Sequence, residues 1–350
     1  MAGIEELLKV TRQHNASDLH LVSGSAPYLR LAGDMVRLNY KSVSPEVCQA
    51  LVYGILTDRQ RESFEENWEL DFSYPVRDVG RFRVNVFMQR AGLAAVFRLI
   101  PDEVPTMEEL GLPEQIVDLV DVSEGLILVT GPTGSGKSTT LASIIHNINE
   151  TRRAHVITIE DPIEFVHQNR QCLINQREVS SHTHSFSNAL RAALREDPDI
   201  ILVGEMRDLE TISLAITAAE TGHLVFATLH TNSAIKAVDR IIDVFPDGQQ
   251  AQIRTMLSES MRGVIAQALL PRADGKGRVA AAEVLVNVPA VANLIREGKA
   301  YQIPSAMQTG RAQGMLTFDT SINELVRTGV VTPEEGRTFL ARRAAGSKRG

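Results

Sequence analysis

The segment Gly131–Ser138, which reads Gly-Pro-Thr-Gly-Ser-Gly-Lys-Ser, constrains the fold more than any other stretch of the chain. It fits the pattern G-x-x-x-x-G-K-[ST] in full, follows an apolar run at residues 125–130, and precedes an apolar-periodic helix at 141–148. In such a strand–loop–helix, glycines let backbone N–H groups surround phosphate oxygens at the positive end of the helix. The sequence therefore predicts a nucleoside triphosphate site within an α/β fold.

This loop is the candidate cofactor site, for a nucleoside triphosphate with Mg²⁺. Lys137 would place a cation at the β- and γ-phosphates, and the Ser138 hydroxyl can ligate Mg²⁺. The remaining candidates for nucleotide binding are Gly131, Thr133, Gly134, Ser135, Gly136 and Thr139. A glycine-rich turn without a ligand is the alternative, but it leaves the full match to the constrained positions unexplained.

The region after residue 113 shows the alternation of strands and helices that is typical of a nucleotide-binding domain. Short apolar runs predict strands, and apolar-periodic segments predict helices after Gly136, near 186–195 and after Asp208. The predicted strands are residues 126–130, 156–159, 200–203 and 224–228. Because strands that alternate with helices favour a parallel sheet with crossover connections, we predict an α/β nucleotide-binding domain over residues 114–350, with a helical C-terminal region.

The first hundred residues predict a separate, small α+β domain. Ser44 and Pro45 mark a helix start, because a serine hydroxyl caps well and proline loses nothing at the first helical position. The predicted helices are a short one around residues 4–8, then 45–56 and 58–68; the predicted strands are 19–22, 28–31, 35–38, 70–74, 81–88 and 93–99, with a hairpin turn at 32–34. Residues 101–113 hold three of the fourteen prolines and are the predicted linker.

Composition and charge exclude several classes of protein. Hydrophobic residues make up 43% and charged residues 23% of the 350, which is typical of a globular chain. No apolar run approaches the roughly 18–20 residues of a membrane span, the N-terminus lacks the basic start of a signal peptide, and two cysteines fit a reducing compartment. We therefore expect a cytoplasmic protein. The net charge of −7 falls on residues 101–350, because residues 1–100 carry 12 basic and 12 acidic side chains, and this disfavours nucleic acid as a partner.

Further candidate residues follow the predicted strands of the nucleotide-binding domain. Glu205 follows the third strand and can deprotonate the attacking water, although it could instead cap the next helix. Glu160 and Glu164, after the second strand, would hold Mg²⁺ and water, whereas an Asp- and Pro-rich turn explains them equally well. His230 follows the fourth strand, as a γ-phosphate sensor or a structural histidine. The carboxyl ends of parallel strands share one edge of the sheet, so we expect Glu205 in the crevice of the phosphate loop.

With these residues, the chain resembles the retraction (PilT-like) branch of the type IV pilus ATPases, in the secretion ATPase superfamily. The matching segments are residues 16–21 (Ala-Ser-Asp-Leu-His-Leu), 131–138, 160–165 (Glu-Asp-Pro-Ile-Glu-Phe), 195–208 and 221–232. The resemblance implies a PAS-like first domain, a RecA-like P-loop ATPase domain and a homo-hexameric ring at the inner membrane. Such a ring would hydrolyse ATP to turn an inner-membrane platform protein and depolymerise the pilus, which produces twitching motility. It also supports the roles of Glu160, Glu164, Glu205 and His230 given above.

Two arginines of the first domain acquire a role through this resemblance. Arg83 and Arg98 lie in the predicted strands 81–88 and 93–99 and match the family's arginine-finger strands. From alternation alone, both would be solvent-facing residues of a half-exposed sheet. The resemblance instead implies that they reach a nucleotide held at a subunit interface, and we expect them to come from the neighbouring subunit.

Alternatives to a principal retraction motor remain open. Ala292, where the retraction branch has arginine, and residues 271–278 are closer to an accessory (PilU-like) paralogue, and such a paralogue could also work beside this chain. A pilus-extension or type II secretion ATPase typically carries a four-cysteine insertion, which two unpaired cysteines cannot supply. A nucleic-acid translocase would favour basic loops, and a catalytically idle scaffold would not be expected to retain both Lys137 and Glu205.

Two C-terminal segments also carry predictions. Leu294 and Ile295 are expected to couple hydrolysis to the pilus base, so that their replacement by alanine would spare hydrolysis and abolish twitching; a role in the helix core is the alternative. The basic residues near the chain end are expected to form a solvated tail rather than a lipid anchor. They are Arg342, Arg343, Lys348 and Arg349.

Overall fold

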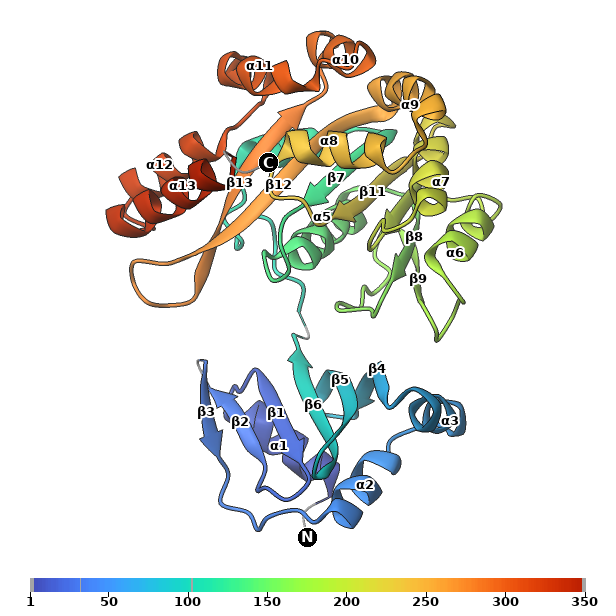
Figure 1. Ribbon diagram of the computed structural model, residues 1–350, viewed down its shortest axis with the longest axis vertical. Coiled ribbons are helices and arrows are strands. Elements are labelled where there is room, and N and C mark those ends of the chain that lie inside the picture. Colours follow the sequence, from blue (N-terminus) through green and yellow to red (C-terminus); the bar gives the residue numbers. More distant parts are fainter. Residues whose placement is uncertain (1–2, 32, 102, 348–350) are drawn as a thin grey trace. The chain divides into compact units, whose positions relative to one another are not determined.

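The computed structural model describes residues 3–31, 33–101 and 103–347. They form two compact units, each with its own sheet and core: the first comprises Met1–Glu103 and Pro162–Val166, the second Val104–Asp161 and His167–Gly350 (Figure 1). Four residues named in the sequence predictions lie outside the described part of the chain. They are Ala32 of the hairpin turn, Asp102 of the linker, and Lys348 and Arg349 of the basic tail.

The first unit is a six-stranded antiparallel sheet with the order β3-β2-β1-β6-β5-β4. The strands are β1 (Asp18–Val22), β2 (Tyr28–Leu31), β3 (Asp34–Arg37), β4 (Glu69–Val76), β5 (Gly80–Gln89) and β6 (Gly92–Ile100); the helices are α1 (Ile4–Gln13), α2 (Pro45–Tyr53) and α3 (Asp58–Asn67). Each predicted strand and helix is present. Ser44 accepts a hydrogen bond from the Val47 N–H and Pro45 is the first residue of α2, as predicted.

Alternation along these strands gives the sheet an apolar face and a polar face. The apolar face packs against all three helices in one core, which includes Leu7, Leu8, Leu19, Leu21, Leu29, Cys48, Phe64, Phe82, Val84 and Phe97. On the opposite face, directly paired residues form a charged row across four strands. These residues are Arg30, Asp18, Arg98 and Arg83, on β2, β1, β6 and β5 in that order.

The second unit contains a seven-stranded sheet with the order β13-β12-β7-β11-β10-β8-β9. All neighbours are parallel except β12 and β13. The strands are β7 (Gly125–Thr130), β8 (His155–Glu160), β9 (Leu173–Glu178), β10 (Ile200–Val203), β11 (Leu224–Leu229), β12 (Met261–Pro271) and β13 (Arg278–Val286). The predicted α/β class with a mainly parallel sheet is confirmed, while β9, β12 and β13 were not predicted.

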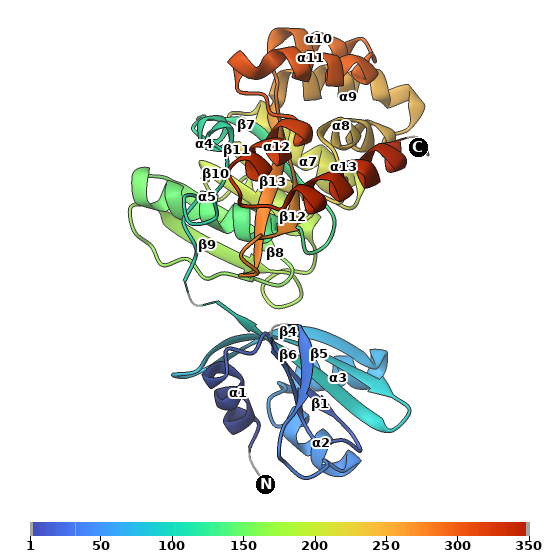
Figure 2. The same ribbon diagram turned by 90° about the vertical axis from the view of Figure 1, so that its left-hand side faces the viewer.

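Helices cover both faces of this sheet (Figures 1 and 2). One face packs against α4 (Glu114–Val120) and α5 (Lys137–Thr151). The other packs against α6 (Phe186–Ala193), α7 (Leu209–Glu220), α8 (Ala234–Asp243), α9 (Asp247–Ser260), α10 (Pro289–Arg296) and the segment η1 (Ala300–Gln302) with α11 (Ile303–Thr309). The central strands are therefore buried on both sides, which explains why their sequences are apolar without alternation.

The C-terminal segment packs onto the β12–β13 hairpin. After η2 (Gly310–Gln313), helices α12 (Phe318–Arg327) and α13 (Pro333–Ser347) form a small core with the hairpin. In α10, Ile295 has no exposed surface and Leu294 packs against the same large core as α9. The alternative assignment of Ile295 to the helix core is therefore correct, and an alanine there would remove core packing worth about 2–5 kcal/mol.

Candidate active site

The phosphate loop joins the carboxyl end of β7 to the first residue of α5, as predicted. Gly136, which immediately precedes the helix, has a φ of +89°, a conformation that favours glycine. A Cβ atom at Gly131 would collide with the carbonyl oxygen of Gln267, so the loop lies too close to β12 for a side chain at that position. Since α5 begins at Lys137, the unpaired N–H groups and the positive end of the helix lie at the loop.

Two side chains indicate that this loop fits a phosphate group. Lys137 is buried, and its Nζ donates hydrogen bonds to the carbonyl oxygens of Gly131 at 2.9 Å and Pro132 at 3.2 Å. The Oγ of Ser135 is also buried and has no hydrogen-bond partner among the described residues. A phosphate oxygen would accept a hydrogen bond from Ser135 and attract the ammonium of Lys137. Ser138 is exposed, with its hydroxyl available to a cation beside the phosphates.

Residues outside the predicted set support the loop from the two strands beside β7. The Thr130 Oγ1 lies 2.6 Å from the Thr231 Oγ1 and accepts a hydrogen bond from the Thr231 N–H at 3.0 Å. Gln267, buried on β12, accepts a hydrogen bond at 2.8 Å from the hydroxyl of Thr140 in the first turn of α5. Sequence gave no signal for Gln267, because its strand was not predicted.

Glu205 follows β10 and has a side-chain partner on each carboxylate oxygen. Arg207 Nη2 lies 2.7 Å from Oε2, and His230 Nε2 lies 3.0 Å from Oε1. Burial by itself would raise the pKa of Glu205, but the hydrogen bond from Arg207 and the proximity of His230 outweigh it, and the pKa lies below its ordinary value. The carboxylate is therefore ionised at neutral pH, as a general base must be.

The helix after Glu205 is capped by a different residue. Asp208 is the N-cap of α7 and accepts a hydrogen bond from the Thr211 N–H at 2.8 Å. The alternative interpretation of Glu205 as this cap is therefore wrong. Glu205 and His230 lie together at the carboxyl edge of the sheet, where each follows one of two neighbouring strands; their direct contact was not predicted. Arg207 was not predicted, and its only signal was its place two residues after Glu205.

Glu160 and Glu164 belong to different units. Glu160, at the end of β8, accepts hydrogen bonds from the Thr158 hydroxyl at 2.6 Å and from Gln176 Nε2 at 3.1 Å. Glu164 is part of the first unit, where its Oε1 lies 3.9 Å from Arg83 Nη1. Among the described residues, no group of three or more His, Cys, Asp or Glu side chains is arranged to hold a metal ion. The role of this glutamate pair toward Mg²⁺ stays a prediction.

Arg83 and Arg98 lie directly opposite each other on β5 and β6. Arg83 pairs with Asp71, with Nη2 2.6 Å from Oδ2 and Nε 3.2 Å from Oδ1. Arg98 Nε donates to Asp18 Oδ1 at 2.9 Å, and the Arg98 side chain is 65% exposed whereas that of Asp18 is 5% exposed. Both arginines therefore have carboxylate partners within the first unit, and their role toward a nucleotide stays a prediction.

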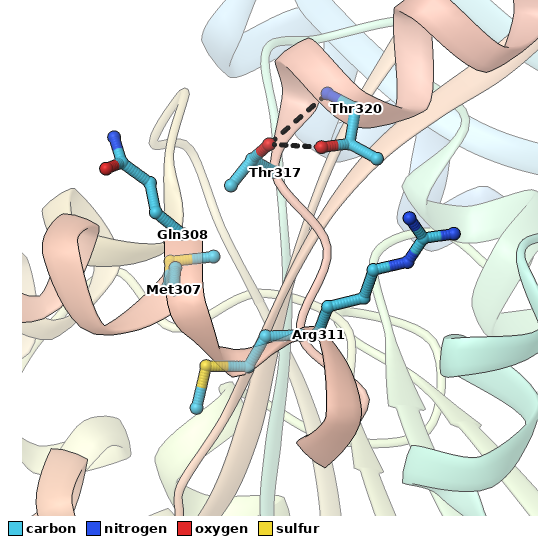
Figure 3. A pocket seen from close by; sticks show the side chains of 6 residues that line it. Met307, Gln308, Arg311, Thr317 and Thr320 are labelled. Carbon is cyan, nitrogen blue, oxygen red and sulfur yellow. Dashed lines mark hydrogen bonds between the residues drawn. The ribbon is translucent and has the colours of Figure 1, made fainter.

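A cavity of about 260 Å³ lies in the C-terminal segment of the second unit (Figure 3). It is lined by Met307, Gln308, Arg311, Met315, Thr317 and Thr320. Thr317 caps α12, since its hydroxyl oxygen accepts a hydrogen bond from the Thr320 N–H at 3.2 Å. None of these residues belongs to the predicted nucleotide site. In the described ranges, no helix combines the length and the apolar character needed to cross a membrane.

The sequence of this chain matches one protein family and several known proteins. Residues 3–338 match the family described as type II/IV secretion system protein. Over 334 residues, the chain is 56% identical to the type IV pilus retraction ATPase PilT of Pseudomonas aeruginosa, which covers 95% of this chain and 97% of that protein. It is 54% identical to a twitching motility protein of Neisseria gonorrhoeae, over 96% and 90% of the two chains.

Two further comparisons bear on the subtype and the fold. The type IV pilus ATPase PilU of Pseudomonas aeruginosa is 42% identical over 331 residues, or 95% of this chain and 87% of that protein. The crystal structure of the pilus retraction motor PilT with bound ADP matches with a TM-score of 0.89 at 49% identity, and the match covers 96% of each chain.

Proposed function

The chain belongs to the family of type II/IV secretion system proteins, and from this we propose that it is an ATPase motor whose hydrolysis of ATP drives the retraction of type IV pili. The observation that supports the proposal is the common edge of the parallel sheet, where the phosphate loop with Lys137 follows β7 and the ionised Glu205 follows β10, with β11 between these strands. The loop supplies phosphate binding, and Glu205 supplies the base.

Different residues of the chain would bind the phosphates, hold the metal ion and activate the attacking water. The loop N–H groups and Lys137 would bind the β- and γ-phosphates, and Ser138 would hold Mg²⁺, which neutralises phosphate charge when bound. Glu205 would orient the attacking water and accept its proton. His230, whose Nε2 lies 3.0 Å from Glu205 Oε1, would sense whether a γ-phosphate is present. Glu160 would contribute to the metal and water arrangement.

Replacement of Lys137 by alanine is expected to weaken nucleotide binding itself. A hydrogen bond to a charged group contributes about 1.5–3 kcal/mol, so the dissociation constant for ATP should rise by about 10- to 100-fold. Titration calorimetry with ATP measures this, and Lys276→Ala, in the β12–β13 turn, is the matched control. Unchanged affinity in Lys137→Ala would remove the lysine from the phosphate site.

We also propose the assembly and partners of this motor. The chain would form a homo-hexamer attached peripherally to the cytoplasmic side of the inner membrane, where it turns a platform protein of the pilus base. Identity is higher with PilT, at 56%, than with PilU, at 42%, which favours the principal motor over the accessory paralogue. Whether a paralogue works beside it is decided by the phenotype of each single deletion.

A deletion strain tests the direction of the motor. Without this protein, cells should remain piliated but stop twitching, and the wild-type gene should restore movement. Cells without pili would instead assign the motor to pilus extension. Stimulation of the purified ATPase by single-stranded DNA would favour a nucleic-acid translocase.

The coupling role predicted for Leu294 and Ile295 needs a test on a neighbouring residue of α10 that leaves the core intact. Ile295 is fully buried, whereas Arg296 is exposed, with its Nη2 3.9 Å from Glu259 Oε1. We expect Arg296→Ala to keep ATPase activity within about twofold, because a surface change of this kind costs less than about 0.5 kcal/mol of stability. We expect it to reduce twitching, because Arg296 lies on the helix proposed to couple hydrolysis to the pilus base. The exposed Arg327→Ala on α12 is the control. Normal twitching in Arg296→Ala would exclude this arginine from coupling.

A further inference from the structure

The four residues after β11, His230–Ser233, form a short segment that we term the sensor loop. Its first residue contacts Glu205, with 3.0 Å between His230 Nε2 and Glu205 Oε1. Its second residue, Thr231, is hydrogen-bonded to Thr130 immediately before the phosphate loop. The conformation of the sensor loop therefore sets how His230 meets the proposed base, and how β11 is tied to the phosphate loop.

A side chain from the far end of the chain holds the second half of this loop. Arg343, in the last turns of α13, donates from Nη1 to the carbonyl oxygen of Asn232 at 2.7 Å. Its Nη2 lies 3.3 Å from Oε2 of Glu283 on β13, and the other oxygen of Glu283 accepts a hydrogen bond from the Ala234 N–H at 2.8 Å.

The contacts of this pair with the loop are contacts to its backbone. The Asn232 carbonyl and the Ala234 N–H flank Ser233, which caps α8 with its own hydroxyl. One arginine–glutamate pair therefore fixes the peptide groups on both sides of the cap. Such contacts constrain the backbone of the sensor loop independently of the conformations of its side chains.

The pair is sheltered from water, so each member depends on the other. The Glu283 side chain is 12% exposed and that of Arg343 is 28% exposed, and the Arg343 guanidinium lies over the Phe318 ring, 4.0 Å from its centroid. Burial raises the pKa of Glu283, as expected where a carboxylate leaves water. Removal of Arg343 or Glu283 would leave the other charge uncompensated in a poorly solvated site. The backbone of the sensor loop would also lose a hydrogen bond to the removed side chain.

From these contacts we propose that Arg343 is a positioning residue for ATP hydrolysis: with Glu283 it holds the sensor loop so that His230 meets Glu205 in the catalytic geometry. The sequence-based expectation of a solvated tail is wrong for this arginine. The proposal rests on the proposed ATPase function, because it assigns Arg343 a role in that reaction and no separate activity. Arg343 touches no reacting atom; it acts through the loop.

The test compares three substitutions of Arg343 with one at its neighbour in the full-length protein. Arg343→Ala removes all contacts, Arg343→Met keeps an apolar stem to pack on Phe318, and Arg343→Lys keeps one charged donor. The control is Arg342→Ala, which removes the same charge from an exposed position on the same helix. The readouts are kcat, KM, ATP affinity by calorimetry and the urea unfolding midpoint.

We expect kcat to fall by about 10- to 100-fold in Arg343→Ala and Arg343→Met, because a misplacement of about 1 Å in a catalytic arrangement costs that much. ATP affinity should stay within about threefold of wild type, since the contacts that Arg343 makes are with Asn232 and Glu283 and the substitutions change no residue of the phosphate loop. Arg343→Lys should recover part of the loss, and Arg342→Ala should match wild type. A purely structural role would lower the unfolding midpoint without this split between kcat and affinity.

A double-mutant cycle with His230→Ala tests the route through the loop. If Arg343 acts by positioning His230, then Arg343→Ala should lower kcat little further once His230 is absent. Full additivity of the two losses overturns the proposal, as does wild-type kcat in Arg343→Ala, or failure of both Arg343→Ala and Arg343→Met to fold. A wild-type protein that hydrolyses no ATP would refute the proposed function instead, which keeps the two failures distinct.

Discussion

Replacement of Glu205 by glutamine is expected to lower the rate of ATP hydrolysis by about 10²- to 10⁴-fold, the usual contribution of a general base, while ATP still binds. Glutamine keeps the shape of the side chain and can still orient the attacking water, but it cannot accept the proton. The pKa of Glu205 lies below its ordinary value, so the base is ionised throughout the neutral range and the loss should not depend on pH there. Single-turnover hydrolysis and calorimetry on the same preparation measure the two effects separately.

Glu210→Gln, on the exposed surface of α7, provides the matched control for the loss of one carboxylate. It should hydrolyse ATP like wild type. A loss smaller than tenfold in Glu205→Gln would contradict the assignment of the base, since a residue that merely pairs with Arg207 could account for it. Loss of ATP affinity in Glu205→Gln would also contradict it.

Rings that contain two inactive variants are expected to regain ATPase activity. An arginine supplied to a transferring phosphoryl group is worth about 10³- to 10⁵-fold in rate, and we propose that Arg83 and Arg98 act on the nucleotide of a neighbouring subunit. Lys137→Ala chains and Arg98→Ala chains should each be inactive alone. When they co-assemble, some interfaces combine an intact Lys137 with an intact Arg98, and activity reappears there.

The side chain of Arg98 is suited to such a role because it is 65% exposed on the polar face of its sheet, while Asp18 holds it at one nitrogen. Arg90→Ala, in the turn between β5 and β6, is the control and should leave homogeneous rings active. Mass spectrometry of intact rings must show both chains in each ring. If such mixed rings stay as inactive as either parent, the arginines act within their own chain or not at all.

Local patterns in the sequence were sufficient for the parts of the site that depend on consecutive residues. The phosphate loop was predicted because its glycines and Lys137 act through a fixed local geometry. Glu205 was predicted to lie in the crevice of the phosphate loop, and His230 was predicted as a γ-phosphate sensor, because both follow strands of one parallel sheet. These two inferences needed only the rule that such strands end at a common edge.

What the sequence did not predict depends on contacts between distant residues. Gln267 supports the phosphate loop from β12, more than a hundred residues away in the chain. Arg343 looked like part of a basic tail because the arginine-rich end shows no sign of the buried Glu283 that receives it. Arg83 and Arg98 were expected on strands, but only the pairing of β5 with β6 places them opposite each other. Charge and hydropathy along a sequence do not specify such partners.

The strand order of the second unit also constrains how this chain folds during its synthesis. β7 lies between β11 and β12, so one of its edges stays unpaired until residues 261–271 have left the ribosome. β12 begins about 130 residues after β7 ends. At a translation rate of about 5–20 residues per second, this edge of β7 stays unpaired for about 7–26 s before β12 has been synthesised. During that interval an apolar strand with unsatisfied backbone groups is open to pairing with other nascent chains, which makes translation speed and chaperone supply determinants of the yield of folded motor.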